Sequence, residues 1–215
     1  MKAIRQGKNI ILEPPRHLRT LVWLHGLGDS ADGFLPLFEN FQVVDDCKIV
    51  LLTAPIRPVT LNMGFEMTSW YDIAALGRRD MNEQVVESAG IISEVLDEER
   101  KLTDEVALGG FSQGGAMSLY TGLVHYPHPL KGIVSLSGYT MNYQIREDRK
   151  NIPVFLYNGK EDQMVSFEMA QEGFETTLRG ANYEFHSEES LGHSISQSEI
   201  ATLSEWFKKV FNLQL

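Results

Sequence analysis

The sequence predicts an α/β protein whose central sheet is mainly parallel and is covered by helices on both faces. Short apolar runs rich in β-branched residues alternate with longer segments of helical spacing. The runs are apolar at nearly every position, which is typical of strands that are buried on both sides. The length of 215 residues suits one domain, and we expect it to span residues 1–215.

Each element follows from a local pattern. The apolar runs predict strands at residues 20–25, 48–52, 106–108, 132–136, 154–157 and 183–186. Helical spacing predicts helices at residues 81–101, 114–125, 166–179 and 197–211. In the first of these helices, Val85, Ala89, Ile92 and Leu96 form one apolar stripe. Gly180 is a suitable C-terminal cap for the third.

Two connections between these elements bear on function. The segment 53–80 has no clear periodicity, and a loop this long inside a compact domain is usually functional. The segment 137–152, by contrast, is too short to hold a helical cap domain over the sheet. We therefore expect an open site at the carboxyl ends of the strands, where sites lie in folds of this class.

Composition excludes several classes of protein. The formal net charge of −10 argues against a nucleic-acid partner, because few cations are available to neutralise phosphates. Cys47 is the one cysteine, so no intramolecular disulfide forms. The first residues lack the apolar core of a signal peptide, and no run approaches 18 apolar residues. We expect a cytoplasmic protein without a transmembrane segment.

The segment 110–114 (GFSQG) carries the strongest chemical signal in the chain. It is a G-x-S-x-G motif that follows a predicted strand and opens a predicted helix, which is the context of a nucleophile elbow. In such a turn the serine is held in a strained conformation, with its hydroxyl lifted clear of the sheet. This predicts an α/β-hydrolase with Ser112 as the nucleophile. The alternative is a glycine-rich turn that only packs a helix on the sheet.

A serine nucleophile needs a base, which follows it in the chain of such hydrolases. The candidates are His125, His128, His186 and His193. His125 and His128 flank a proline at a helix end, and His186 falls within a predicted strand, so structural roles suit them better. We predict His193 as the base, because it lies in a loop between the last strand and the last helix.

The acid that orients the base should follow the penultimate strand, where Glu161 and Asp162 compete. A solvated acidic turn is the alternative interpretation of this pair. For the oxyanion hole, we predict the N–H groups of Gln113, directly after the nucleophile, and of Leu27 in the loop after the first predicted strand. His25 precedes the nucleophile in the chain, so we expect it to be structural.

Several segments together resemble one family more specifically than the serine motif does. They are HGLGD at 25–29, RPVTLN at 57–62, WYDI at 70–73, GGFSQGG at 109–115 and GH at 192–193. This pattern resembles the acyl-protein thioesterase / phospholipase–carboxylesterase family, from about residue 20 to the last helix. The resemblance implies a single-domain α/β-hydrolase without a large cap that cleaves S-acyl groups from proteins, lysophospholipids and carboxylic esters.

The resemblance also assigns site residues. It implies a triad of Ser112, Asp162 and His193, with Leu27 and Gln113 as the oxyanion donors. It further implies that the region 53–76 helps to form an apolar channel for the acyl chain. The candidate substrate-binding residues are Leu61, Met63, Phe65, Trp70 and Met164. Ordinary core packing is the alternative role for each of them. Neither a metal nor a cofactor is expected.

The chain departs from the family pattern at three places beside the expected acyl channel: at 158–159 (NG), at 139–141 (YTM) and at 163–166 (QMVS). These departures bear on substrate preference and remove no catalytic group. The expected partner is an acylated protein or a lipid or ester substrate, and transient contact with a membrane surface is compatible with this. A monomer and a homodimer both fit the sequence. The alternative functions are a carboxylesterase for a small-molecule ester and a non-catalytic acyl-binding protein.

Overall fold

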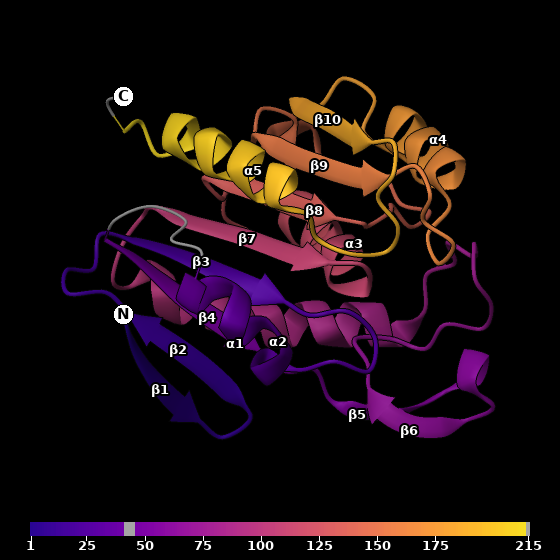
Figure 1. The fold of residues 1–215 in the computed structure, drawn as a ribbon, viewed down its shortest axis with the longest axis horizontal. Coiled ribbons are helices and arrows are strands. Elements are labelled where there is room, and N and C mark those ends of the chain that lie inside the picture. The colour runs from indigo at the N-terminus through magenta and orange to yellow at the C-terminus, as the bar shows by residue number, and fades with distance from the viewer. Residues whose placement is uncertain (41–45, 214–215) are drawn as a thin grey trace.

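The computed structural model describes residues 1–40 and 46–213. Within them, one sheet of eight strands has the order β1-β2-β4-β3-β7-β8-β9-β10 (Figure 1). Its strands are β1 (Lys2–Gln6), β2 (Asn9–Glu13), β3 (Arg19–Leu24), β4 (Cys47–Leu52), β7 (Val106–Phe111), β8 (Gly132–Leu136), β9 (Val154–Gly159) and β10 (Tyr183–Glu188). All neighbouring pairs from β4 to β10 are parallel, whereas β1 and β2 are antiparallel.

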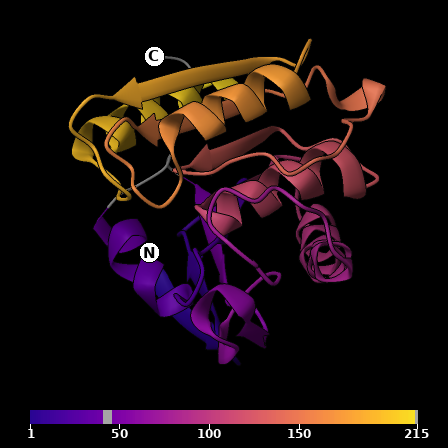
Figure 2. The ribbon, with the colours of Figure 1, turned by 90° about the vertical axis from the view of Figure 1, so that its right-hand side faces the viewer.

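Helices cover both faces of the sheet, as the sequence predicts. On one face, α2 (Glu83–Arg100), α3 (Gln113–Tyr120) and α4 (Phe167–Thr177) pack their apolar side chains into one core cluster. On the other face, α1 (Ala31–Asn40) and α5 (Gln197–Val210) build a second core cluster. Figure 2 shows α1 and α2 on opposite sides of the strands.

Four strands and one helix lie where the sequence pattern predicts none. The strands β1 and β2 form an antiparallel pair at one edge, and β1 is mostly exposed, so it lacks the apolar run of a buried strand. The helix α1 contains Pro36, which disrupts a helical pattern. Within the segment 53–80, β5 (Ile56–Val59) and β6 (Phe65–Thr68) form a separate hairpin around a short 3₁₀ turn, Thr60–Asn62.

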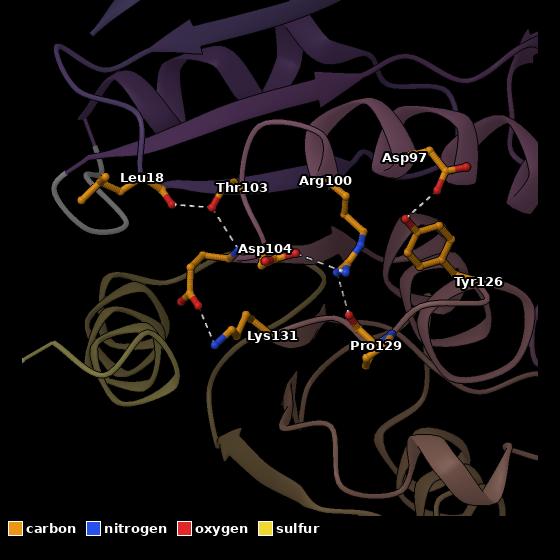
Figure 3. A network of polar contacts seen from close by, with 9 residues as sticks. Leu18, Asp97, Arg100, Thr103, Asp104, Tyr126, Pro129 and Lys131 are labelled. Atoms are coloured by element: carbon orange, nitrogen blue, oxygen red, sulfur yellow. Dashed lines mark hydrogen bonds and ion pairs between the residues drawn. The ribbon is translucent and has the colours of Figure 1, made fainter.

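At the amino ends of β7 and β8, polar contacts join α2 to the loop that leads into β8 (Figure 3). The Tyr126 hydroxyl donates to Asp97 at 2.8 Å, and the Arg100 guanidinium donates to the Pro129 carbonyl at 3.1 Å. This network lies at the opposite end of the strands from Ser112. Among the residues described, no helix combines the length and apolar character needed to cross a membrane.

The first turn of α5 buries Glu199 completely. Its carboxylate closes a capping box by accepting from the N–H of Ser196, but its Oε1 has no hydrogen-bond partner in the part of the chain that the structure describes. Burial raises the pKa of Glu199 to about 8; the backbone N–H of Ser196 opposes this shift, and the charge of Glu188 adds to it. The side chain is therefore protonated at neutral pH when the protein is folded.

Glu199→Gln is expected to stabilise the protein at alkaline pH. Below pH 4.5 the carboxyl is protonated in both states, whereas between pH 4.5 and about 8 only the unfolded chain ionises, so native stability falls through this window. Glutamine keeps the capping bond and carries no charge. The free energy of unfolding that the variant gains over wild type should grow between pH 5 and pH 9, and it should reach about 4 kcal/mol at pH 9. Denaturant melts at both pH values measure it, and parallel pH profiles would contradict it. The exposed Glu205 of the same helix provides the control variant, Glu205→Gln.

Candidate active site

Ser112 occupies a sharp turn between β7 and α3. Its backbone has φ 55° and ψ −118°, a conformation that non-glycine residues rarely adopt. The flanking glycines have no space for a side chain: a Cβ at Gly110 would lie 2.4 Å from backbone atoms of Gly114, and one at Gly114 would lie 2.2 Å from the Leu24 carbonyl oxygen. The geometry is that of a nucleophile elbow rather than of a glycine-rich packing turn.

The structure brings Ser112, His193 and Asp162 together at the carboxyl ends of three strands. The Nε2 atom of His193 lies 2.9 Å from the Oγ of Ser112, and its Nδ1 lies 2.7 Å from the Oδ2 of Asp162. Ser112 follows β7, Asp162 follows β9 and His193 follows β10. Glu161, the competing acid, is exposed to solvent and does not contact the imidazole. The Asp162 side chain is fully buried.

Asp162 remains ionised although it is buried. Burial raises the pKa of this carboxyl, but hydrogen bonds from His193, Val165 and Met164 outweigh it, so the pKa lies below its ordinary value. The N–H groups of Met164 and Val165 both donate to Oδ1, at 2.8 and 2.9 Å, which leaves Oδ2 for the imidazole. The carboxylate therefore holds His193 with Nδ1 protonated and Nε2 free to accept a proton from Ser112.

The two predicted oxyanion donors both line the cavity beside Ser112. Gln113 is the first residue of α3, so its N–H has no intrahelical acceptor and forms part of the positive end of the helix dipole. Leu27 lies in the loop after β3, and the N–H of the next residue, Gly28, donates to the Thr68 carbonyl at 2.8 Å. That bond attaches the Leu27 loop to the β5–β6 hairpin.

The Gln113 side chain has a structural role that the sequence did not predict. Its Nε2 donates to the Tyr71 carbonyl at 2.7 Å, and its Oε1 accepts from the Trp70 N–H at 2.9 Å. The buried amide thus clamps the segment 69–71 beside Ser112. No local pattern signals this contact, because its partners are 42 and 43 residues away in the chain.

His25 is structural, as predicted. Its ring is buried, its Nε2 accepts from the Ala54 N–H at 3.0 Å, and its Nδ1 lies 2.5 Å from the Gly26 carbonyl oxygen. Burial lowers the pKa of His25, which keeps the ring neutral. Its backbone carbonyl in turn accepts from the indole N–H of Trp70 at 2.9 Å.

An apolar cavity of about 320 Å³ opens beside Ser112. Apart from Ser112, His193, Leu27 and Gln113, its wall is mostly aliphatic and aromatic, and it includes Leu61, Met67, Ile73, Leu76, Phe111, Tyr139, Met164, Val165 and Met169. The elements that form it are the β5–β6 hairpin, the loop 73–78 and the start of α4. Among the described residues, no three His, Cys, Asp or Glu side chains gather as metal ligands would.

The five candidate substrate-binding residues fall into two groups. Leu61 and Met164 line the cavity. Met63 and Phe65 do not: they lie on the hairpin, 87% and 66% exposed, because Met63 occupies its left-handed turn and the strand after it projects into solvent. Trp70 is completely buried against His25 and also lies outside the cavity wall. The structure therefore does not bring all five residues together in one channel.

The Phospholipase/Carboxylesterase family model matches residues 6–211. The chain belongs to this family. Acyl-protein thioesterase 1 homolog 1 of Dictyostelium discoideum is 34% identical over 221 residues, which cover 97% of this chain and 98% of the relative.

Solved structures of family relatives agree with the fold. Carboxylesterase SOBER1 of Arabidopsis thaliana superposes with a TM-score of 0.83 at 31% identity, over 90% of this chain and 99% of that one. Zea mays acyl-protein thioesterase 2 also gives 0.83, at 29% identity, over 95% and 99%. These findings confirm the predicted family and the α/β-hydrolase fold. The family fold has no large cap here, since the β8–β9 connection holds one short 3₁₀ turn, Glu147–Arg149.

Proposed function

We propose that this protein is a serine hydrolase that removes acyl groups from thioesters and esters, with acylated proteins as its substrate class. The observation that carries the proposal is His193, which bonds Ser112 through one ring nitrogen and Asp162 through the other, at the edge of an apolar cavity. Relatives named acyl-protein thioesterase and carboxylesterase support the thioester and ester chemistry.

In this mechanism His193 Nε2 takes the Ser112 hydroxyl proton while Oγ attacks the acyl carbonyl carbon. The resulting oxyanion accepts hydrogen bonds from the N–H groups of Leu27 and Gln113, each worth about 3 kcal/mol in the transition state. The imidazolium then donates its proton to the departing thiol or alcohol, which leaves an acyl-enzyme on Ser112. Water, deprotonated by the same imidazole, hydrolyses that ester and restores the serine.

The apolar cavity is the proposed site of the acyl chain. Its volume of about 320 Å³ lies near the lower end of the roughly 300–1,000 Å³ range of ligand pockets. A panel of thioesters and matched oxygen esters with acyl chains from acetyl to palmitoyl tests the assignment. We expect hydrolysis of both classes, with kcat/KM rising beyond acetyl. A preference that stops at acetyl would instead indicate an esterase for a small-molecule ester.

Exposed apolar side chains beside this cavity support transient contact with a membrane surface, where acylated proteins reside. Ile56, Met63 and Phe65 are 70%, 87% and 66% exposed, and all three belong to the β5–β6 hairpin. Exposed apolar side chains on both ends of one short hairpin favour its contact with an apolar surface.

Leu61→Trp is expected to lower kcat/KM for octanoyl esters at least about tenfold and to leave acetyl esters nearly unchanged, because the indole would fill the cavity that holds the longer chain. Steady-state kinetics with soluble acetyl and octanoyl esters measures the ratio. Met63→Trp is the matched control, since Met63 lies outside the cavity wall. The assignment would be contradicted if Met63→Trp lowered the octanoyl-to-acetyl ratio of kcat/KM, or if Leu61→Trp left that ratio unchanged.

A further inference from the structure

Glu188 is the last residue of β10 and precedes His193 by five positions. Its Oε2 atom accepts three hydrogen bonds: from the Tyr157 hydroxyl at 2.9 Å, from the Ser196 hydroxyl at 2.6 Å and from the Ser198 hydroxyl at 2.6 Å. One carboxylate oxygen therefore joins the ends of β9 and β10 to the beginning of α5.

These bonds close the loop that carries His193. Ser196 is the N-cap of α5, so Glu188 and Ser196 stand at the two ends of the segment 189–195. The positive end of the α5 dipole favours a negative charge at this place. Hydrogen bonds from Ser196, Ser198 and Tyr157 lower the pKa of Glu188, which keeps it ionised at neutral pH.

The remaining contacts hold the first half of the loop. The Lys160 N–H donates to the Glu188 carbonyl at 2.9 Å, and the Glu161 N–H donates to the Leu191 carbonyl at 3.0 Å. Both bonds attach the loop to the segment that carries Asp162. Between His193 and α5, the Ser194 N–H donates to the Gly192 carbonyl at 2.9 Å and Ser196 shares a capping box with Glu199, and both contacts stay within the loop and α5. Among the described residues, this half of the loop is attached to the rest of the protein by the packing of Ile195 against the core and by the Glu188–Ser196 bond.

We propose that Glu188 is a positioning residue for His193: by fixing the distance between the end of β10 and the N-cap of α5, it holds the imidazole within reach of both Ser112 and Asp162. The proposal rests on the proposed function, in which His193 is the base. Without the Glu188 carboxylate, the α5 end of the loop loses its polar attachment to β10, and the imidazole shifts. Glu188 does not line the substrate cavity, so the apolar wall that holds the acyl chain stays in place.

Glu188→Ala is expected to lower kcat by about 10- to 100-fold with KM within about twofold of wild type, because a misplacement of about 1 Å costs on the order of 10²-fold in rate. Tyr157→Phe and Ser198→Ala each remove one of the three bonds, so each should cause a smaller fall in kcat. These milder variants keep the test decisive should Glu188→Ala fold poorly.

Two further substitutions distinguish the effect of the length of the Glu188 side chain from the effect of its charge. Glu188→Gln keeps an acceptor at the same reach and should restore much of the rate, whereas Glu188→Asp keeps the charge, is one methylene shorter and should behave like Glu188→Ala. The matched control is Glu184→Ala, an exposed glutamate on the same strand and the same side of the sheet, which contacts His186. Its kcat should equal that of wild type.

A spectroscopic measurement distinguishes positioning from simple stability. The proton between His193 Nδ1 and Asp162 should give a far-downfield ¹H resonance in wild type and in Glu184→Ala, and this resonance should weaken in Glu188→Ala. Unchanged kcat and resonance in Glu188→Ala, or an equal loss in Glu184→Ala, would overturn the proposal. His193→Ala separates the two levels: full activity there overturns the proposed function, whereas an inactive His193→Ala beside a fully active Glu188→Ala overturns the positioning role alone.

Discussion

Ser112→Ala should reduce kcat for ester and thioester hydrolysis by about 10⁶-fold, to the rate that the oxyanion hole and substrate binding alone support. The loss is this large because Oγ is the atom that forms the acyl-enzyme. The fold should be retained, since the Ser112 N–H still donates to the Leu136 carbonyl and its own carbonyl still accepts from Ala116. Labelling by a serine-directed fluorophosphonate should be lost as well, because the probe reacts with the same Oγ. Hydrolysis rates, labelling and circular dichroism measure the three effects.

A matched control for this variant lies at the end of the neighbouring strand. Like Ser112, Ser137 has a positive φ, of 46°, but it is fully buried, and its hydroxyl has no hydrogen-bond partner among the described residues. Ser137→Ala should therefore keep both hydrolysis and labelling. Equal fluorophosphonate labelling of Ser112→Ala and wild type would contradict Ser112 as the nucleophile.

Asp162→Asn is expected to lower kcat by about 10⁴-fold without unfolding the protein. The N–H groups of Met164 and Val165 donate to Oδ1, so the asparagine will place its carbonyl oxygen there and turn its NH₂ toward His193. An NH₂ group at that place needs an acceptor, which forces Nδ1 of the imidazole to be unprotonated and moves the ring proton to Nε2. The imidazole can then no longer take the proton of Ser112.

Steady-state rates across the neutral pH range measure this loss. Glu161→Gln serves as the control, because it removes the adjacent, exposed acid that competes with Asp162 for this role in the sequence. Its rate should match wild type. A large loss in Glu161→Gln with an active Asp162→Asn would reverse the assignment of the acid.

Features set by local sequence were predictable. The buried strands and the long helices follow from apolar runs and stripes; the stripe at 81–101, for example, corresponds to α2 at Glu83–Arg100. The elbow around Ser112 follows from steric demands that only glycine meets at positions 110 and 114. Chain order then placed His193, and Asp162 required the resemblance as well, because two adjacent acids have the same local pattern.

Features set by long-range packing were not predictable. Sequence shows that Met63, Phe65 and Trp70 are apolar, but not that a hairpin exposes the first two while the third is buried beside His25. The direction of a side chain depends on strand register and on what packs against the hairpin. Contacts such as those of Glu188 join elements whose proximity arises only in the folded sheet.

The clamp formed by Gln113 has a consequence for recombination between relatives. It holds the segment 69–71 mainly through backbone atoms, the Trp70 N–H and the Tyr71 carbonyl, which every chain possesses at those positions. Consider a chimera with its crossover between residues 72 and 112, so that one parent supplies the segment 69–71 and the other supplies position 113. The clamp still forms in such a chimera, provided that the second parent carries this glutamine. The β5–β6 hairpin can thus be exchanged together with everything before it while the segment 69–71 keeps its attachment beside Ser112.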